Sequence, residues 1–350
     1  MSSFTRRFAA RALLATACAA FVPAAGAQDP VLNLYSARHY PTDEALYTNF
    51  TKASGIRIQR VEADDAGILA RLKAEGTASP ADVILLVDGA RLWRAEQEGL
   101  FQPVKSALLE QRIPPSLRGA DSGQGSSWYG MTMRARIVVY DKSRIKPADV
   151  DRYEKLAAPA LAGQLCIRSG SHPYNLSLFA AMLEHLGAQR TEKWLEGLVA
   201  NLARAPKGGD TDQIKSVAAG ECGVAVTNSY YLARLMRSAA PADREVVERL
   251  GVVFPDQAGR GTHVNISGAA VARHAKHRDA AVKFIEYLAS DAAQRMLADG
   301  NNEYPAVASV RTDNPALAAL GPFKIDAVPI ARIGANTAQV QQMLDRVGFK

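Results

Sequence analysis

Short apolar segments alternate with amphipathic helical segments along most of this chain, and this alternation restricts the fold more than any other feature. Residues 82–87 (Asp-Val-Ile-Leu-Leu-Val) and 223–227 (Gly-Val-Ala-Val-Thr) are continuous apolar runs typical of buried parallel strands. Before the first of these runs, Ile68, Leu69 and Leu72 fall on one face of a predicted helix. The pattern predicts an α/β fold in which mostly parallel sheets are flanked by helices.

The length of the chain favours two lobes, because its 350 residues exceed what a single core usually holds. Residues 114–130 are rich in proline, glycine and serine, and a long apolar strand follows them. That strand, near 131–137, and a second one near 252–257 are predicted to cross between the lobes as hinge strands. The first lobe is assigned residues 28–133 and 257–305, and the second 134–256 and 306–350.

The N-terminus has the pattern of an export signal. Three arginines precede an apolar run at 12–22, and Ala-Gly-Ala at 25–27 is a typical cleavage site. Residues 1–27 are therefore predicted to be a cleaved signal peptide that sends the protein to the periplasm. No later stretch approaches the roughly 18 uninterrupted apolar residues of a membrane helix, so stable membrane insertion is not expected.

The net charge limits the kinds of partner that the protein can bind, and the cysteine count indicates whether a disulfide is expected. Removing residues 1–27 takes away three arginines and no acids, so the net charge falls from +7 to +4. The positive residues are dispersed, which makes nucleic acid an unsuitable partner. Cys166 and Cys222 then remain, and an even count in an exported protein favours a disulfide, with two buried free thiols as the alternative.

Tyrosines follow the ends of three predicted strands. Tyr230 and Tyr231 come directly after the strand at 223–227, and Tyr40 and Tyr174 lie in the loops after two other strands. Open α/β sheets bind ligands at such strand-to-helix junctions. Phenolates are hard anionic donors suited to Fe³⁺, and a bound cation removes the phenol proton despite its ordinary pKa of about 10. These four tyrosines are the predicted metal ligands.

Three further residues complete the predicted site. His39 adjoins Tyr40, as either a fifth ligand or a hydrogen-bonding neighbour, and Arg134 and Arg234 are placed to balance the negative charge of the phenolates. Structural roles remain open as alternatives. One of the tandem tyrosines could pack in the core while the other covers the surface. Tyr40 could cap a helix entry, and Tyr174 could stack on the chain near Pro173.

Enzyme signatures are absent from the sequence. There is no Gly-x-Ser-x-Gly, no His-Glu-x-x-His, no P-loop and no Gly-x-Gly-x-x-Gly that opens a helix. Asp64 and Asp65 are adjacent, so they are not held across a cleft as a glycosidase pair would be. We therefore expect a binding protein and not an enzyme.

Several motifs together resemble the periplasmic ferric-iron-binding proteins of ABC importers, in the branch typified by the cyanobacterial iron-binding proteins. They are residues 35–40 (Tyr-Ser-Ala-Arg-His-Tyr), 81–88, 91–103, 166–169, 210–215, 228–231 (Asn-Ser-Tyr-Tyr), 261–268 and 303–305 (Glu-Tyr-Pro). The resemblance covers nearly the whole chain after the signal peptide. It implies a two-lobed type II periplasmic binding protein, a monomer, that closes over one ferric ion and delivers it to an ABC permease.

The same resemblance places the family's tyrosine ligands on Tyr40, Tyr174, Tyr230 and Tyr231. Its occasional histidine ligand falls on His39, and its cleft arginines match Arg134 and Arg234, the latter being the one that responds to iron oxidation state. Fe²⁺ as the cargo and a carbonate-like anion beside the metal stay open. The loop at 170–173 (Gly-Ser-His-Pro) departs from the serine- and asparagine-rich stretch expected there.

Two other functions compete with iron binding. A protein of this fold could bind a small organic or oxyanion solute, with the tyrosines stacking on it or hydrogen-bonding to it. A secreted enzyme on the same scaffold would need a convergent base and nucleophile, and the sequence shows none. Colour separates iron from the organic solute, because phenolate-to-Fe³⁺ charge transfer absorbs visible light.

Overall fold

A computed structural model describes residues 30–38 and 40–350. The predicted signal peptide at 1–27 and the predicted ligand His39 lie outside the described residues. Within the described part of the chain, no helix combines the length and apolar character needed to cross a bilayer.

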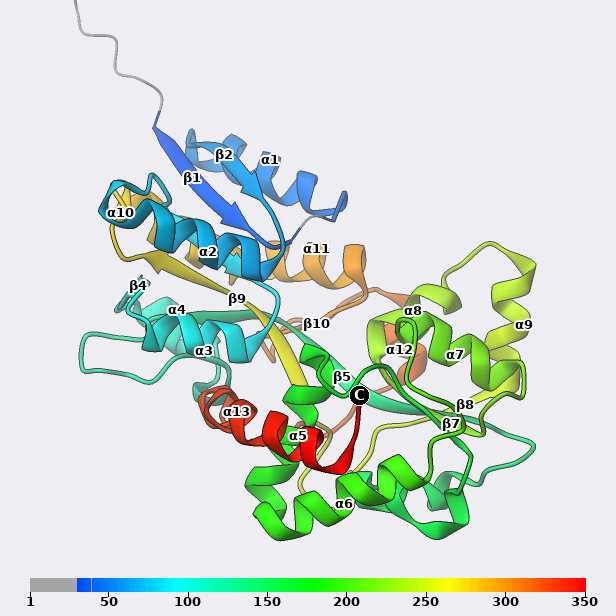
Figure 1. Cartoon of the computed structure of the whole chain (residues 1–350). Helices are drawn as coiled ribbons and strands as arrows, with labels where there is room; N and C mark the ends of the chain where they lie inside the picture. The colour runs from blue at the N-terminus through cyan, green and yellow to red at the C-terminus, as the bar shows by residue number, and fades with distance from the viewer. Residues whose placement is uncertain (1–29, 39) are drawn as a thin grey trace, which may run out of the picture.

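Within the described residues, ten strands are joined in one continuous path that divides into two sheets, and both sheets share one long strand (Figure 1). The first sheet has the order β2-β1-β3-β9-β5 and the second the order β5-β7-β6. The first sheet and its side pairings contain β1 (Val31–Ser36), β2 (Arg57–Glu62), β3 (Val83–Leu86), β4 (Phe101–Gln102), β9 (Val264–Ala272) and β10 (Tyr304–Pro305). The second contains β6 (Leu165–Cys166), β7 (Val224–Asn228) and β8 (Leu250–Val253), and β5 (Tyr129–Asp141) belongs to both.

Helices cover both sheets, as the alternating pattern predicts. The helices are α1 (Asp43–Ser54), α2 (Asp65–Glu75), α3 (Gly89–Gln97), α4 (Ala107–Arg112), α5 (Pro173–Leu186), α6 (Ala188–Ala200), α7 (Asp210–Ala218), α8 (Ser229–Met236), α9 (Pro241–Arg249), α10 (Arg278–Leu288), α11 (Asp291–Asn301), α12 (Pro315–Leu320) and α13 (Ile330–Val347). Short 3₁₀ turns lie at η1 (Gly76–Ala78), η2 (Pro115–Leu117), η3 (Pro147–Asp149), η4 (Tyr153–Ala157) and η5 (Pro159–Leu161).

The predicted parallel pairings are confirmed at the core of each sheet. β1 pairs in parallel with β2 and β3, and β6 pairs in parallel with β7. β3 is buried at every position, which is why its sequence is a continuous apolar run. The predicted α/β fold with helix-flanked sheets is therefore confirmed. The sheets are not mostly parallel, however, because β5 and β9 pair only in antiparallel fashion with their neighbours among the described strands.

The strand β9 is antiparallel to both of its main neighbours, and the sequence pattern does not predict it. It lies between β3 and β5, with every residue buried. Asn265, Ser267 and Gly268 interrupt its apolar run. The glycine is required by close packing, because a Cβ at Gly268 would lie 2.5 Å from a methyl of Leu92 and 2.9 Å from the carbonyl oxygen of Tyr129.

β5 crosses from one sheet to the other near the predicted position. Its first half pairs with β9 and its second half with β7 and β8 (Figure 1). The return between β8 and β9 overlaps the predicted crossing at 252–257, but residues 254–263 form a loop. Asp256 (φ 64°) and Gly261 (φ 99°) adopt left-handed backbone there, which a strand cannot accommodate.

The last long helix contacts elements of both sheets. α13 packs on α3, which follows β3, and on α5 and α6, which follow β6. Figure 1 shows α13 lying alongside α5, between the two groups of elements. The assignment of 306–350 to the second lobe, like the other lobe boundaries, stays a prediction.

Candidate metal centre

The tandem tyrosines lie where the sequence places them, at a strand-to-helix junction. β7 ends at Asn228 and α8 begins at Ser229, so Tyr230 and Tyr231 occupy the first turn of the helix. Tyr230 is buried and Tyr231 is half-buried, and their ring centroids are 4.1 Å apart. Helix N-termini carry partial positive charge, which favours an anionic oxygen nearby.

Tyr174 reaches this pair from the first turn of α5. Its hydroxyl lies 3.1 Å from the hydroxyl of Tyr230. The unexpected His172 serves as the N-cap of α5, because its Nδ1 accepts the N–H of Tyr174 at 3.2 Å. Burial and the neighbouring Arg168 lower the pKa of His172 to about 4, so the ring is neutral and able to accept. The departure at 170–173 therefore leaves the reach of Tyr174 intact.

Tyr40 completes a cluster of four phenols. It follows β1, and it lies close enough to Tyr174 and Tyr230 to raise the pKa of both phenols. Burial raises the pKa of Tyr40, Glu303 raises it further, and Arg38 and Arg134 oppose the rise. The guanidinium of Arg38 lies 5.1 Å from the centre of the Tyr40 ring.

The pKa values of Tyr40, Tyr174 and Tyr230 are all raised, so these phenols resist ionisation without a cation. Burial raises the pKa of Tyr174 to about 12, and burial with the other phenols raises the pKa of Tyr230 well above its ordinary value. Phenolates packed this closely repel one another, so the cluster resists ionising unaided. A small, highly charged cation between the oxygens reverses that balance, because it attracts each phenolate and displaces each proton.

Of the two predicted arginines, Arg134 is buried beside the cluster. Burial alone would lower its pKa, but Glu303 and the phenols raise it, so the guanidinium stays charged. It donates to Ser267 Oγ (2.7 Å) and lies 3.3 Å from a Glu303 oxygen. The orientation of its charge is therefore fixed.

Arg234 is exposed and lies on the outer side of the pair. Its guanidinium carbon is 5.8 Å from the ring centre of Tyr230 and 5.7 Å from that of Tyr231. With Tyr231 it lines an open pocket of about 640 Å³ that also contains Lys215 and Arg237. A solvent-facing cation at this place can respond to a change of charge in the cluster.

Comparison with known proteins decides the family. Residues 45–321 match the family described as bacterial extracellular solute-binding protein. This chain belongs to that family.

Two of the following relatives of this solute-binding protein are described with iron. Iron uptake protein A2 of Synechocystis sp. is 47% identical over 328 residues, covering 93% of this chain and 92% of that protein. A structure described as Trichodesmium IdiA (FutA) in complex with iron and citrate ligands has a TM-score of 0.87 and 45% identity, covering 91% of this chain and 100% of that one. Apo FutA2 from Synechocystis PCC6803 has a TM-score of 0.86 and 46% identity, covering 92% and 100%. The resemblance seen in the motifs is confirmed.

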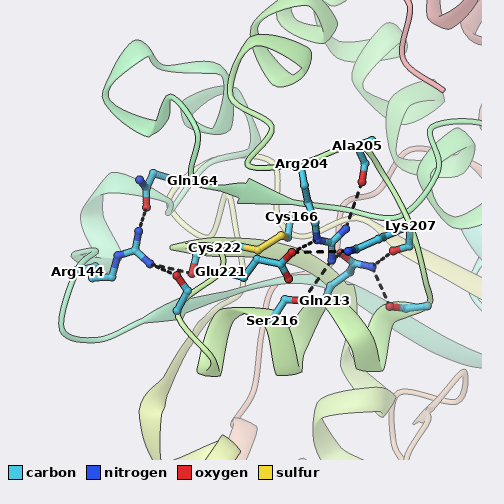
Figure 2. The surroundings of a disulfide bond; sticks show 12 residues. Arg144, Gln164, Cys166, Arg204, Ala205, Lys207, Gln213, Ser216, Glu221 and Cys222 are labelled. Carbon is cyan, nitrogen blue, oxygen red and sulfur yellow. Dashed lines mark hydrogen bonds and ion pairs between the residues drawn. A yellow bond between two sulfur atoms is a disulfide. The ribbon is translucent and has the colours of Figure 1, made fainter.

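The predicted disulfide of this solute-binding protein is also confirmed. Cys166 in β6 is bonded to Cys222 just before β7, with their Cα atoms 5.8 Å apart (Figure 2). Among the described residues, these cysteines and Glu221 form a group with potential metal-ligand atoms within 4.8 Å of one another. The two sulfurs are bonded to each other in the disulfide, and Glu221 is paired with Arg204 (2.9 Å), so this group is structural.

Sequence reasoning missed the charged residues that support the phenols. Arg38 and Glu303 lie buried beside Tyr40 and Arg134, and Asp210 lies buried behind Tyr174. All three belong to the motifs that carry the resemblance, which was the available signal. Apart from the Arg38–Asp43 pair, their charged partners are distant in sequence, so no local pattern assigns them a role.

Proposed function

We propose that this solute-binding protein captures Fe³⁺ between its lobes through the phenolates of Tyr40, Tyr174, Tyr230 and Tyr231. The observation that carries the proposal is the convergence of these phenols, of which Tyr174 and Tyr230 have their hydroxyls 3.1 Å apart. Oxygens packed this closely can all bind one small cation. A pocket for an organic solute would instead need donors and acceptors distributed over its walls. The iron-related names of the relatives support the same choice.

Charge balance supports the ferric form. Four phenolates around one Fe³⁺ leave one net negative charge, and Arg134 and Arg234 both lie near the phenols and supply positive charge. Reduction to Fe²⁺ would leave two net negative charges and weaken the complex. His39 or a carbonate-like anion completes the coordination in this proposal, and the Trichodesmium relative is described with both iron and citrate.

The cargo passes to the permease of an ABC importer. In the proposal the protein is a monomer, is exported to the periplasm by cleavage after residue 27, and has no catalytic role. Its first lobe comprises 28–133 and 257–305, and its second comprises 134–256 and 306–350. The ligands then divide between lobes, with His39 and Tyr40 in the first and the other three tyrosines in the second.

Metal analysis and the visible spectrum of the purified mature protein test the function. Addition of ferric citrate is expected to give a phenolate-to-Fe³⁺ band and one bound iron per chain. Tyr230→Phe and Tyr231→Phe each remove one oxygen and keep the ring. Each should lower the iron affinity by more than the roughly 10- to 100-fold typical of a residue behind the ligands.

Tyr287→Phe is the matched control, because the pKa of Tyr287 is raised by burial alone and no cluster residue influences it. Its iron affinity and band should equal those of the wild type. A colourless wild-type protein that takes up an organic solute, or tandem variants with unchanged colour and affinity, would refute the ferric assignment.

A further inference from the structure

A fully buried carboxylate lies behind the tyrosine cluster, at the first residue of α7. The helix is capped by a different acid, Asp212, whose Oδ2 accepts the N–H of Gly209 at 2.7 Å. Asp210 is therefore not the capping residue of its own helix, and its carboxylate oxygens bind other groups.

One oxygen of Asp210 fixes the strand that leads to the tandem tyrosines. Its Oδ2 accepts the backbone N–H of Asn228 at 2.7 Å and also accepts Nη1 of Arg136 at 2.7 Å. Asn228 is the last residue of β7, two positions before Tyr230. Arg136 lies opposite Asn228 on β5, so the carboxylate joins two neighbouring strands at the site.

The other oxygen of Asp210 fixes a cation against Tyr174. Its Oδ1 accepts Nη1 of Arg168 at 3.3 Å, and the guanidinium carbon of Arg168 lies 5.1 Å from the centre of the Tyr174 ring. The guanidinium of Arg136 lies 5.9 Å from the same ring. Asp210 thereby orients both cations that flank Tyr174.

A second line of hydrogen bonds closes the network around Tyr174. Arg136 donates from Nη2 to the side-chain oxygen of Asn175 at 2.5 Å. Asn175 donates in turn to the carbonyl oxygens of Arg168 (2.8 Å) and Ser169 (2.9 Å). The loop before Tyr174 is thus held by the same group that holds the backbone before Tyr230.

We infer that Asp210 is a positioning residue that holds Tyr174, Tyr230 and Tyr231 in ligating geometry before metal arrives. This inference rests on the proposed ferric function and adds to it the group that prearranges the second-lobe half of the site. Metal ligands in proteins depend on such outer partners for orientation.

Removing the charge of Asp210 has two opposite effects on iron affinity, so the direction of the change tests the inference. An asparagine at 210 leaves Arg136 and Arg168 with more uncompensated positive charge, which by itself favours phenolates and tightens iron binding. The amide also replaces one accepting oxygen by a donor, so it cannot keep all three hydrogen bonds. If positioning dominates, affinity falls despite the gain in positive charge.

The experiment compares Asp210→Asn with Asp212→Asn in the mature protein. Both variants remove one charge from the first turn of α7, but Asp212 is exposed and its asparagine can still cap the helix. With iron supplied as ferric citrate, Asp210→Asn should bind about 10- to 100-fold more weakly, as for other residues that orient ligands. At saturating iron its visible band should be shifted or weakened. Asp212→Asn should match the wild type in both.

The band at saturation separates positioning from a general loss of stability, because a destabilised but correctly arranged site would still give the wild-type spectrum. If Asp210→Asn does not fold, Arg168→Gln decides, since it leaves Asp210 paired with Arg136 and removes the partly exposed cation that the carboxylate holds against Tyr174. A shifted band and weaker binding in Arg168→Gln support the inference, and a wild-type band and affinity overturn it.

The two proposals fail in different ways. A wild-type protein without affinity for ferric citrate and without a visible band overturns the ferric function. A wild-type protein that binds iron normally, together with an Asp210→Asn variant of equal affinity and identical band, overturns only the role of Asp210.

Discussion

Two guanidiniums and two carboxylates lie buried together beside Tyr40. Arg38 donates to Asp43 (3.0 Å) and to Glu303 (2.9 Å), and the other oxygen of Glu303 lies 3.3 Å from Arg134. Burial alone would raise the pKa of Glu303, but Arg38 and Arg134 outweigh it and hold the pKa below its ordinary value. The group is neutral as a whole, so it fixes the arginines beside the phenols at little net charge.

Glu303→Gln should destabilise the protein by about 3 kcal/mol at pH 7, because it leaves two buried guanidiniums short of a counter-charge. Urea unfolding at several pH values measures the effect. Since the folded pKa of Glu303 is depressed, its contribution is full above the unfolded pKa, whose ordinary value is 4.5. It is lost as the pH falls through the folded pKa, so wild type and variant should converge there.

Glu192→Gln is the control for this change. Glu192 pairs with Arg346 at 2.6 Å on the surface, where solvent screening leaves such a pair little effect on stability. If Glu303→Gln lowers the free energy of unfolding no more than Glu192→Gln does, the buried group does not hold the arginines in place.

Residues that act through local position could be predicted, and residues that act through distant partners could not. The tandem tyrosines stand out because a strand ends and a helix begins around them. Glu303 is separated from Arg38 by 265 positions, and its carboxylate has no neighbouring pattern that distinguishes it from a surface acid. Only the folded chain brings these charges together.

At the scale of elements, β9 shows why one central strand escaped prediction. Its Asn265 accepts the N–H of Gly89 (2.9 Å) and donates to Asp88 (2.8 Å), so it fixes the start of α3. Its Ser267 accepts hydrogen bonds from Arg134 and Arg38. The polar side chains that break the apolar run are those that support the site, so the local pattern and the global fold disagree there.

A glycine in α13 allows this helix to pack closely against α3. A Cβ at Gly334 would lie 2.7 Å from the Cβ of Trp93, an atom that moves only with its own helix. On its other side α13 contacts α5, where Asn336 donates to the carbonyl oxygen of Ala180 (3.3 Å) and Arg332 pairs with Glu184 (2.8 Å). One helix thus joins elements that follow strands of different sheets.

Gly334→Ala should therefore destabilise the protein despite the better helix propensity of alanine. The propensity gain is about 1 kcal/mol, and overpacking a close helix contact costs about 1 to 3 kcal/mol, so a net loss of about 1 kcal/mol is expected. Urea unfolding measures it, with Gln339→Ala on the exposed side of α13 as the control, which should stay within about 0.5 kcal/mol of the wild type. A stabilised Gly334→Ala variant would contradict the close seat of α13 on α3.

At the scale of the whole molecule, the proposed site spans the strand that the two sheets share. Arg134 on β5 lies opposite Asn265 of the first sheet, and two residues later Arg136 lies opposite Asn228 of the second. Tyr40 follows β1 of the first sheet, whereas Tyr230 follows β7 of the second. A hinge motion about β5 and the loop at 254–263 would therefore separate Tyr40 from the other phenols while leaving those three together.

This division predicts an order of binding. Fe³⁺ should dock first on Tyr174, Tyr230 and Tyr231, which one network prearranges, and Tyr40 should join when the lobes close. Tyr40→Phe should therefore leave the association rate close to that of the wild type and raise the dissociation rate, because its oxygen acts after docking. Tyr231→Phe should slow association as well. Stopped-flow recording of the visible band with ferric citrate measures both rates, and small-angle scattering with and without iron follows the closing of the lobes. Equal slowing of association by the two variants would contradict docking on the second lobe first, since Tyr40 would then take part in the initial encounter.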